Sequence, residues 1–287
     1  MIDAFTLARA LAQYRSDGYA VLRGVFTAAE VAAIAGAFAR HWAKGVAYPK
    51  SFRHGNLLYR LGEDESLGKI LRLVQWPSYV DPLLEQMRRD PRWLAILEPL
   101  IGRDIKQIIN QLHWKPPGAA GAEFAFHQDA RFRRPASAYR NLATSYVQTG
   151  LAIDPHRRAN GAMRLYPGSQ RLGAKELAGP GPVLDQAMGD EQLIAAGLDP
   201  KKLVDVELDP GDVALWNVYT IHGSGPNETS GDRRFYLNGY VRAQDCDRGE
   251  WAFRDGVPVP LGEPVLVHYE ELHTRPEPHF LEGDGLQ

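Results

Sequence analysis

The first third of the chain alternates between helical patterns and one short strand. The apolar run at residues 19–25 is β-prone and is bounded by glycines, which predicts a strand. Thr27 and Glu30 have the spacing of a capping box, and an Ala-rich stretch at residues 31–42 follows them. This arrangement predicts a helix directly after the strand.

Residues 45–75 are polar and aperiodic, and we expect them to be irregular. Residues 78–101 have a helical pattern that Asp90-Pro91 interrupts. An Asp-Pro pair is typical of an N-cap followed by proline at the first helical position, so two helices are predicted, the second ending at Gly102.

From Ile105 onward the pattern changes to short β-prone runs separated by Gly and Pro turns. These runs cover residues 105–115, 142–153, 162–166, 204–208, 213–216 and 234–242, with a helical insert at about 184–196. Such a series favours a mainly β fold of the jelly-roll or barrel kind over alternating βαβ units. The tail from Asp247 is rich in Pro and Gly, so we expect loops there.

No repeat or linker divides the chain, so one domain over residues 1–287 is predicted. Its parts are a mainly helical N-terminal part (1–104), a β core (105–245) and a C-terminal wrap (246–287). The net charge of −2 provides no basic field of the kind that nucleic-acid-binding proteins carry.

The cysteine count and the apolar pattern bear on location. Cys246 is the only cysteine, which excludes an internal disulfide and is compatible with a reducing compartment. Residues 1–15 contain charged side chains among the apolar ones and do not resemble a signal peptide. No apolar run is long enough to span a membrane. A cytoplasmic protein is expected, and its oligomeric state is left open.

Two segments of the second half carry the candidate chemistry. His127-Gln128-Asp129 places an imidazole and a carboxylate two residues apart, and His222 supplies a second imidazole from a later apolar segment. Residues i and i+2 of a strand project to the same face. Two His and one carboxylate on one face are the ligands of a mononuclear non-haem Fe(II) site that activates O2.

A second His-x-Glu arrangement occurs near the C-terminus. His268 and Glu270, with His279 downstream, lack a strand–turn–strand setting, and we therefore prefer the first group. The remaining histidines are expected at the surface or behind the ligands; they are His41, His54, His113, His156 and His273.

Arg233 follows His222 at the start of an apolar strand. A guanidinium buried on a β face needs an anionic partner, and the neighbouring sequence supplies none. A dicarboxylate cosubstrate would provide one. Arg234 is expected to be a solvated edge charge.

The ordered series of motifs resembles the phytanoyl-CoA dioxygenase (PhyH) family of Fe(II)/2-oxoglutarate oxygenases, over about Tyr14 to Val241. The resemblance is carried by residues 17–22, 127–129, 160–170, 210–213 and 222–227. Gln170 stands where the family usually has His.

The resemblance implies a double-stranded β-helix (jelly-roll) core with N-terminal helices packed around it. It implies Fe(II) ligands at His127, Asp129 and His222, and Arg233 pairing with the distal carboxylate of 2-oxoglutarate. The further contacts with 2-oxoglutarate that the resemblance suggests are Ser224, Gln111 and, more loosely, Lys115. The implied reaction is hydroxylation of a small-molecule substrate with release of succinate and CO2. Asp129 favours hydroxylation, because related halogenases have a small residue there.

The substrate is not readable from the sequence. Arg131, Arg133 and Arg134 follow the His-x-Asp motif and could bind a small anion, or they could lie in a solvated loop. Two other functions stay open. A cupin-like metalloenzyme would use the triad without 2-oxoglutarate, against which Arg233 and Ser224 argue; a non-catalytic binding protein would not need the intact triad.

Overall fold

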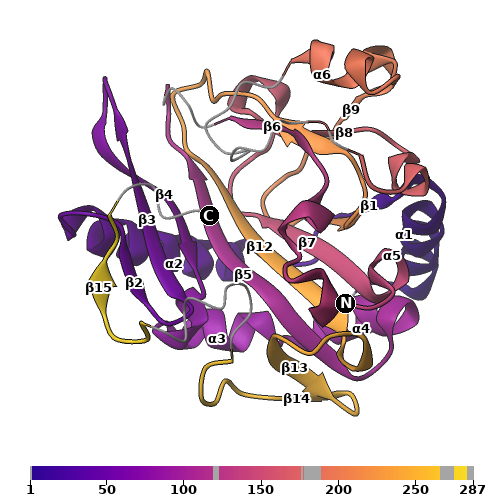
Figure 1. Ribbon diagram of the computed structural model, residues 1–287, viewed down its shortest axis with the longest axis horizontal. Helices are drawn as coiled ribbons and strands as arrows, with labels where there is room; N and C mark the ends of the chain where they lie inside the picture. The colour runs from indigo at the N-terminus through magenta and orange to yellow at the C-terminus, as the bar shows by residue number, and fades with distance from the viewer. Residues whose placement is uncertain (1, 119–122, 176, 178–188, 266–274, 283–287) are drawn as a thin grey trace.

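The computed structural model describes residues 2–118, 123–175, 177, 189–265 and 275–282 (Figure 1). The helices are α1 (Ala4–Asp17), α2 (Ala28–Ala47), α3 (Pro82–Arg88), α4 (Pro91–Ile101), α5 (Leu142–Ser145) and α6 (Asp190–Ala195). The strands are β1 (Tyr19–Leu22), β2 (Phe52–His54), β3 (Leu57–Asp64), β4 (Gly68–Gln75), β5 (Ile105–Lys115), β6 (Phe124–His127), β7 (Tyr146–Ala152), β8 (Met163–Leu165), β9 (Val204–Asp205), β10 (Val213–Asn217), β11 (His222–Ser224), β12 (Arg233–Arg242), β13 (Glu250–Arg254), β14 (Val257–Pro258) and β15 (His279–Phe280).

Within the described residues the strands form two antiparallel sheets. The larger has the order β1-β10-β7-β12-β5-β4-β3-β2-β15, with β13 paired to β5 and β14 paired to β13, and the smaller has the order β6-β11-β8-β9. A buried cluster between the sheets combines Met163 and Leu165 of the smaller sheet with Ala214, Trp216 and Phe235 of the larger. The predicted double-stranded β-helix core is therefore confirmed.

The N-terminal helices cover the outer face of the larger sheet, as Figure 1 shows for α2 and α3. Alternation along β5 explains the two faces, because neighbouring residues project to opposite sides. Leu112 and Trp114 point outward into the main core, where Trp114 packs on Phe38 of α2 with ring centroids 4.8 Å apart. Gln111, His113 and Lys115 occupy the alternate positions and face the interior between the sheets.

The predicted helix signals are confirmed. Thr27 and Glu30 form a reciprocal capping box at the start of α2. The Asp90 side chain accepts a hydrogen bond from the backbone N–H of Arg92 at the start of α4, and Pro91 is the first helical residue. The strand predicted at residues 19–25 is β1, which ends earlier, at Leu22.

Two expectations of irregular structure were wrong. Residues 45–75 contain β2, β3 and β4. The alternation of apolar and polar residues that would predict a strand is absent there, because buried residues follow one another and include Arg60 and Arg72. The tail contributes β13, which pairs with β5, and the β13–β14 hairpin. The sheet thus draws strands from outside residues 105–245.

The other predicted strands are present with shifted limits. The run at 142–153 begins with the single helical turn α5 before β7. Strands β8 and β9 are shorter than the runs that predicted them, whereas β5 has the predicted limits. Of the helical insert at 184–196, α6 is seen, and residues 184–188 lie outside the described residues.

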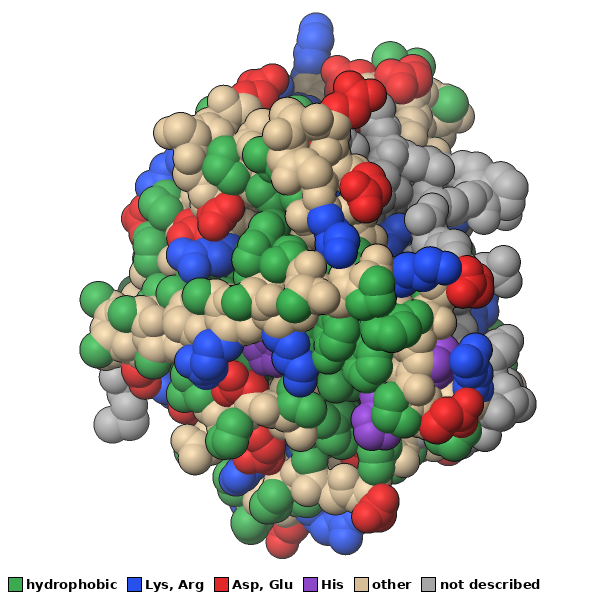
Figure 2. Space-filling model, turned by 90° about the vertical axis from the view of Figure 1, so that its left-hand side faces the viewer, with side chains coloured by type: hydrophobic (Ala, Val, Ile, Leu, Met, Phe, Trp, Pro, Cys, Tyr) green, Lys and Arg blue, Asp and Glu red, His purple; other side chains and the backbone are tan. Residues whose placement is uncertain are grey.

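The β15 edge of the larger sheet forms one side of the molecule. Figure 2 shows hydrophobic side chains gathered near the centre of this face, with charged side chains of both signs around them. Phe280 of β15 is 40% exposed and packs on Phe52 and Tyr48. Among the described residues, no helix combines the length and apolarity needed to cross a membrane.

Candidate active site

Strand pairing in the smaller sheet brings the two candidate histidine ligands together. His127 ends β6 and His222 begins β11, and the two residues are directly opposite in the antiparallel register. Asp129 does not lie on the strand, as the i, i+2 argument assumed, because a 3-10 helix begins at this residue. Gln128 between them keeps an extended backbone, however, so Asp129 still projects to the side of His127.

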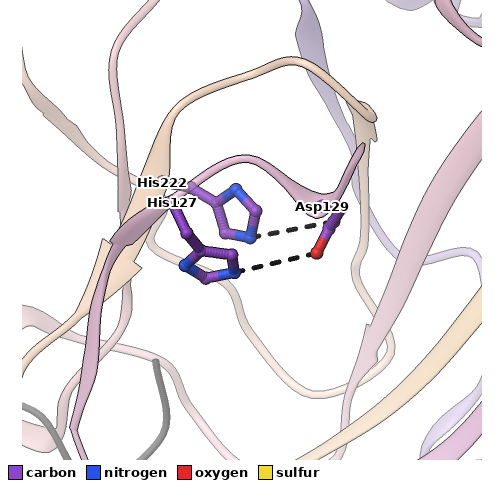
Figure 3. A group of neighbouring side chains, drawn as sticks. All are labelled: His127, Asp129 and His222. Carbon is purple, nitrogen blue, oxygen red and sulfur yellow. Dashed lines mark ion pairs between the residues drawn. The ribbon is translucent and has the colours of Figure 1, made fainter. Parts of the chain in front are cut away.

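The ligand atoms of the three side chains converge (Figure 3). His127 Nε2 lies 3.7 Å from Asp129 Oδ1, and His222 Nε2 lies 3.8 Å from Asp129 Oδ2. All three ligand atoms lie within 4.8 Å of one another. Separations of 3.7–3.8 Å are too long for hydrogen bonds but allow one ion to contact several of the atoms.

Backbone carbonyls fix the orientation of both imidazoles. Nδ1 of His127 lies 2.8 Å from the carbonyl oxygen of Ala125, and Nδ1 of His222 lies 2.9 Å from that of Thr220. A carbonyl can only accept, so Nδ1 carries the proton and Nε2 presents its lone pair toward Asp129. This tautomer is the one that a metal-binding histidine requires.

The charge states also fit a cationic metal. Burial lowers the pKa of His222 to about 4, so its imidazole is neutral near pH 7. Burial acts to raise the pKa of Asp129, but its charged neighbours, Arg133 among them, lower it overall, and the carboxylate stays ionised. Trp216 Nε1 donates a hydrogen bond of 2.9 Å to Asp129 Oδ2 and so orients it. No local pattern predicted this contact, because Trp216 lies on a strand that is distant in the sequence.

The middle residue of the motif points away from the ligands. Gln128 Nε2 donates to the carbonyl oxygens of Gly173 and Tyr219, and its Oε1 accepts from the backbone N–H of Lys175. These bonds connect the motif to two loops and hold the short segment between the two ligands.

Arg233 is buried at the start of β12, with 5% of its surface exposed. None of the hydrogen bonds or ion pairs among the described residues involves its guanidinium, and Nε is buried without a partner. Burial lowers the pKa of Arg233 to about 10, which still leaves it charged at neutral pH.

Aromatic side chains connect Arg233 to the ligands. The guanidinium carbon of Arg233 lies 5.8 Å from the ring centroid of Phe235, and that ring stacks on Trp216 at 6.3 Å. Trp216 in turn contacts His222, with ring centroids 5.6 Å apart. Arg233 therefore lies in the same interior as the three ligands.

The expectation for Arg234 was wrong. Its Nε and Nη2 lie 2.8 and 2.7 Å from the two carboxylate oxygens of Asp154, and its side chain is 22% exposed. Arg234 is thus held in a bidentate ion pair.

The other predicted cosubstrate contacts also face the interior. Ser224 is buried at the end of β11, and its hydroxyl oxygen accepts a 2.7 Å hydrogen bond from Lys115 Nζ. Gln111 lies two positions before His113 on the inner face of β5, and its Oε1 is 2.9 Å from His113 Nε2.

The three arginines after the motif occupy different environments. Arg131 is partly buried, with its guanidinium carbon 5.5 Å from the ring centroid of Phe132, which contacts His127. Arg133 is buried over the ring of Tyr146, at 5.1 Å, and helps to lower the pKa of Asp129. Arg134 is exposed.

The remaining histidines divide between core and surface. His54 is exposed, whereas His41 and His156 are buried and bonded to Tyr59 and to the carbonyl oxygen of Arg234. Residues 268, 270 and 273 lie outside the described residues, and His279 is on the edge strand β15.

The chain belongs to the phytanoyl-CoA dioxygenase (PhyH) family, whose model matches residues 14–235. The family assignment confirms the expectation of an Fe(II)- and 2-oxoglutarate-dependent dioxygenase.

Three relatives that match the chain are named as dioxygenases. The chain is 27% identical over 241 residues to a probable alpha-ketoglutarate-dependent hypophosphite dioxygenase of Stutzerimonas stutzeri, a match of 80% of this chain and 77% of the relative. It is 30% identical to dioxygenase lolE1 of Epichloe uncinata (66% of this chain, 61% of the relative). It is 27% identical to a 2-aminoethylphosphonate dioxygenase of the uncultured bacterium HF130_AEPn_1 (56% and 55%).

Among solved structures, EctD from S. alaskensis with bound Fe superposes with a TM-score of 0.65. The superposition covers 94% of this chain and 87% of EctD, at 22% identity. At that identity the likeness supports the fold.

Proposed function

We propose that His127, Asp129 and His222 bind Fe(II) as a facial triad. The donor set fits, since two imidazoles and one carboxylate are the ligands of Fe(II) oxygenases. The fixed Nδ1–H tautomers and the ionised Asp129 supply that set at neutral pH without a further proton loss.

Arg233 is the anchor for the distal carboxylate of 2-oxoglutarate in this proposal, with Ser224 as a second contact and Gln111 as a third. One observation carries it. A buried guanidinium without an acceptor among the described residues is costly, and a carboxylate would complete it. A cupin-like enzyme that did not use 2-oxoglutarate would leave Arg233 without this role.

Bound iron and 2-oxoglutarate would supply the oxidising chemistry, with succinate and CO2 as by-products. The protein holds the reacting groups in position and encloses them. Trp216 holds the Asp129 carboxylate, and the aromatic rings of Trp216 and Phe235 line the path between the ligands and Arg233. Burial away from water strengthens each charge interaction within such a site.

The substrate in this proposal is a small anion that the Arg131–Arg134 segment binds. Arg133 lies close enough to Asp129 to affect its pKa, so this segment reaches the site. Two relatives are named as a probable hypophosphite dioxygenase and a 2-aminoethylphosphonate dioxygenase, and both of the named compounds are anions that contain phosphorus. A cytoplasmic location remains part of the proposal.

The test is succinate formation from 2-oxoglutarate in the presence of Fe(II) and O2, scanned over a panel of small carboxylates, phosphonates and phosphorus oxyanions with neutral analogues of matched size. At least one anion should stimulate succinate formation above the uncoupled rate. Stimulation by neutral members alone would refute the anionic substrate but not the reaction class.

A further inference from the structure

A small apolar cluster, separate from the main core, combines both sheets with the C-terminal segment. Leu58 of β3 and Leu73 of β4 are buried. Phe124 of β6 and Leu281, the residue after β15, pack against this pair and stay partly exposed. We call these four side chains the apolar wall. Two of its members are thus accessible to a small molecule.

The strand register shows which way the apolar wall faces. Leu73 lies directly opposite His113 of β5, and His113 lies directly opposite Phe235 of β12. Residues that are directly opposite share one face of a sheet, and Phe235 belongs to the buried cluster between the two sheets. Leu58 is on the same face, because its neighbour Tyr59 packs into the main core on the other side. The apolar wall therefore faces the interior that holds the metal ligands.

Aromatic contacts connect the apolar wall to one of the proposed ligands. The ring centroid of Phe124 lies 6.4 Å from that of His127. Phe132 contacts the same imidazole, with ring centroids 5.7 Å apart, and the guanidinium of Arg131 lies over the ring of Phe132. Apolar surface thus extends from the segment proposed to bind the anion, past His127, to Leu281.

The polar groups beside the apolar wall do not require a second anion. The ring centroid of His113 lies 5.8 Å from that of Phe124, and burial together with nearby cations lowers the pKa of His113 to about 3, so this imidazole is neutral. Arg60 lies opposite Leu73 and is buried, and it has its own interactions within the chain. Small-molecule sites combine apolar lining with a few polar groups, and the apolar wall would supply such a lining.

We propose that the apolar wall determines substrate specificity: the substrate is an anion with an alkyl group, whose charged end the Arg131–Arg134 segment binds and whose alkyl group packs against Phe124 and Leu281. The inference rests on the proposed function, from which it takes the anion site. Leu281 lies outside residues 14–235, which the family model matches, so the C-terminal segment of this chain contributes this contact. An inorganic oxyanion would leave the apolar wall without a partner.

Backbone pairing holds Leu281 in place. Its N–H donates to the carbonyl oxygen of Ser51 at 2.8 Å, directly after the pairing of β15 with β2 (Figure 1). The preceding residue, Phe280, packs its ring on Tyr48 and Phe52 instead. Substitutions at these two neighbours therefore separate the apolar wall from the anchoring of the segment.

The test measures affinity against alkyl length by anaerobic calorimetric titration of the protein with Fe(II) and 2-oxoglutarate added. The ligands are n-alkylphosphonates from ethyl to hexyl and the carboxylates with the same alkyl groups. In at least one of the two series, each added methylene should strengthen binding to the wild type about two- to fourfold, because it buries further apolar area.

Leu281→Ala should weaken binding of the hexyl ligand at least about fivefold and change binding of the ethyl ligand by less than about twofold. Phe280→Ala is the matched control and should change neither, although it also removes packing from the C-terminal segment. Should Leu281→Ala not fold, Leu281→Val, which is one methylene shorter than the wild type, enters the same comparison with a smaller loss in the same direction.

Absence of binding, or a wild-type affinity that does not rise with alkyl length in either series, would overturn the inference. Equal losses of the ethyl and hexyl ligands in Leu281→Ala would do the same. A loss of hexyl binding as large in Phe280→Ala would show that Leu281 only helps to anchor its segment. These results differ from failure of the proposed function, in which the wild type would form no succinate from 2-oxoglutarate with any ligand added.

Discussion

His127 and His222 are cross-strand partners, and their ring centroids lie 4.2 Å apart. Each donates its Nδ1 proton to the carbonyl oxygen two residues before it. The register of β6 and β11 thus determines both the spacing of the imidazoles and their tautomers. A metal bound here would depend on strand pairing as much as on the ligand residues.

Asp129→Ala should abolish Fe(II) binding, because it removes the carboxylate that faces both Nε2 atoms. Anaerobic titration with Fe(II) measures the affinity. Asp247→Ala, at an exposed Asp paired with Arg140, is the matched control and should bind iron normally. Wild-type iron affinity in Asp129→Ala would rule out the proposed triad. Iron affinity should also fall at acid pH, as protons compete for the ligands.

Arg233→Ala should weaken 2-oxoglutarate binding by about 3–5 kcal/mol, the usual cost of removing one partner of a buried charge pair, and leave metal binding largely intact. Arg234→Ala is the neighbouring control, since its guanidinium is already bound by Asp154. Calorimetric titration of both variants with 2-oxoglutarate measures the two affinities. If the two lose affinity equally, the assignment of Arg233 as the anchor is wrong.

Arg131→Gln and Arg133→Gln should lose substrate-stimulated succinate formation while keeping the uncoupled reaction. Each charged hydrogen bond to an anion contributes about 1.5–3 kcal/mol, whereas a solvated arginine contributes almost nothing. The exposed Arg134 is the internal control, and Arg134→Gln should react normally. Normal oxidation by all three variants, or a native substrate that is neutral and apolar, would contradict this prediction.

Gly161→Ala should lower Tm more than Gly55→Ala. Both glycines have positive φ, +72° and +55°, so both variants carry a left-handed penalty of about 1–2 kcal/mol. Only at Gly161 would the new Cβ meet backbone atoms, whereas nothing lies within 4 Å at Gly55. Thermal unfolding of the two variants measures the difference. Equal Tm losses would mean that the backbone around Gly225 can shift at little cost.

The stability of the protein should fall as the pH drops from about 6.5 toward 4. Burial lowers the pKa of His41 from its ordinary value of 6.5 to about 4. Between these values the unfolded chain binds a proton at this residue and the folded protein does not, so protonation favours unfolding. Stability from this residue is complete above pH 6.5 and is lost toward pH 4.

Urea unfolding across this pH range measures the effect. His41→Gln removes the titrating group and should flatten the decline, on the order of 1–3 kcal/mol. His54→Gln, at an exposed histidine, should leave the pH dependence unchanged. A decline that is as steep in His41→Gln as in the wild type would assign the effect to other groups.

Local signals predicted much of the fold. The capping box at Thr27 and the Asp90-Pro91 pair determine helix starts through bonds within four residues, so they are readable without tertiary structure. The strands β3 and β4 were missed because buried arginines interrupt their apolar pattern. The groups that compensate a buried charge come from other segments of the chain, so the local sequence does not reveal them.

The candidate site was likewise predictable only in part. The ligand residues follow from spacing and from the family resemblance. The bond from Trp216 to Asp129 and the ion pair of Arg234 with Asp154 join segments far apart in the sequence, and only sheet pairing brings them together. The contact of Lys115 with Ser224 likewise depends on how β5 meets the loop after β11.

The most direct test of the central claim is 2-oxoglutarate turnover. Succinate is quantified with the purified protein in air, with and without added Fe(II), in the wild type and in Asp129→Ala and Arg233→Ala. The wild type should form succinate only when Fe(II), 2-oxoglutarate and O2 are all present. Asp129→Ala should form none, and Arg233→Ala should require far more 2-oxoglutarate. Iron-independent succinate formation, or turnover that survives Asp129→Ala, would contradict the account.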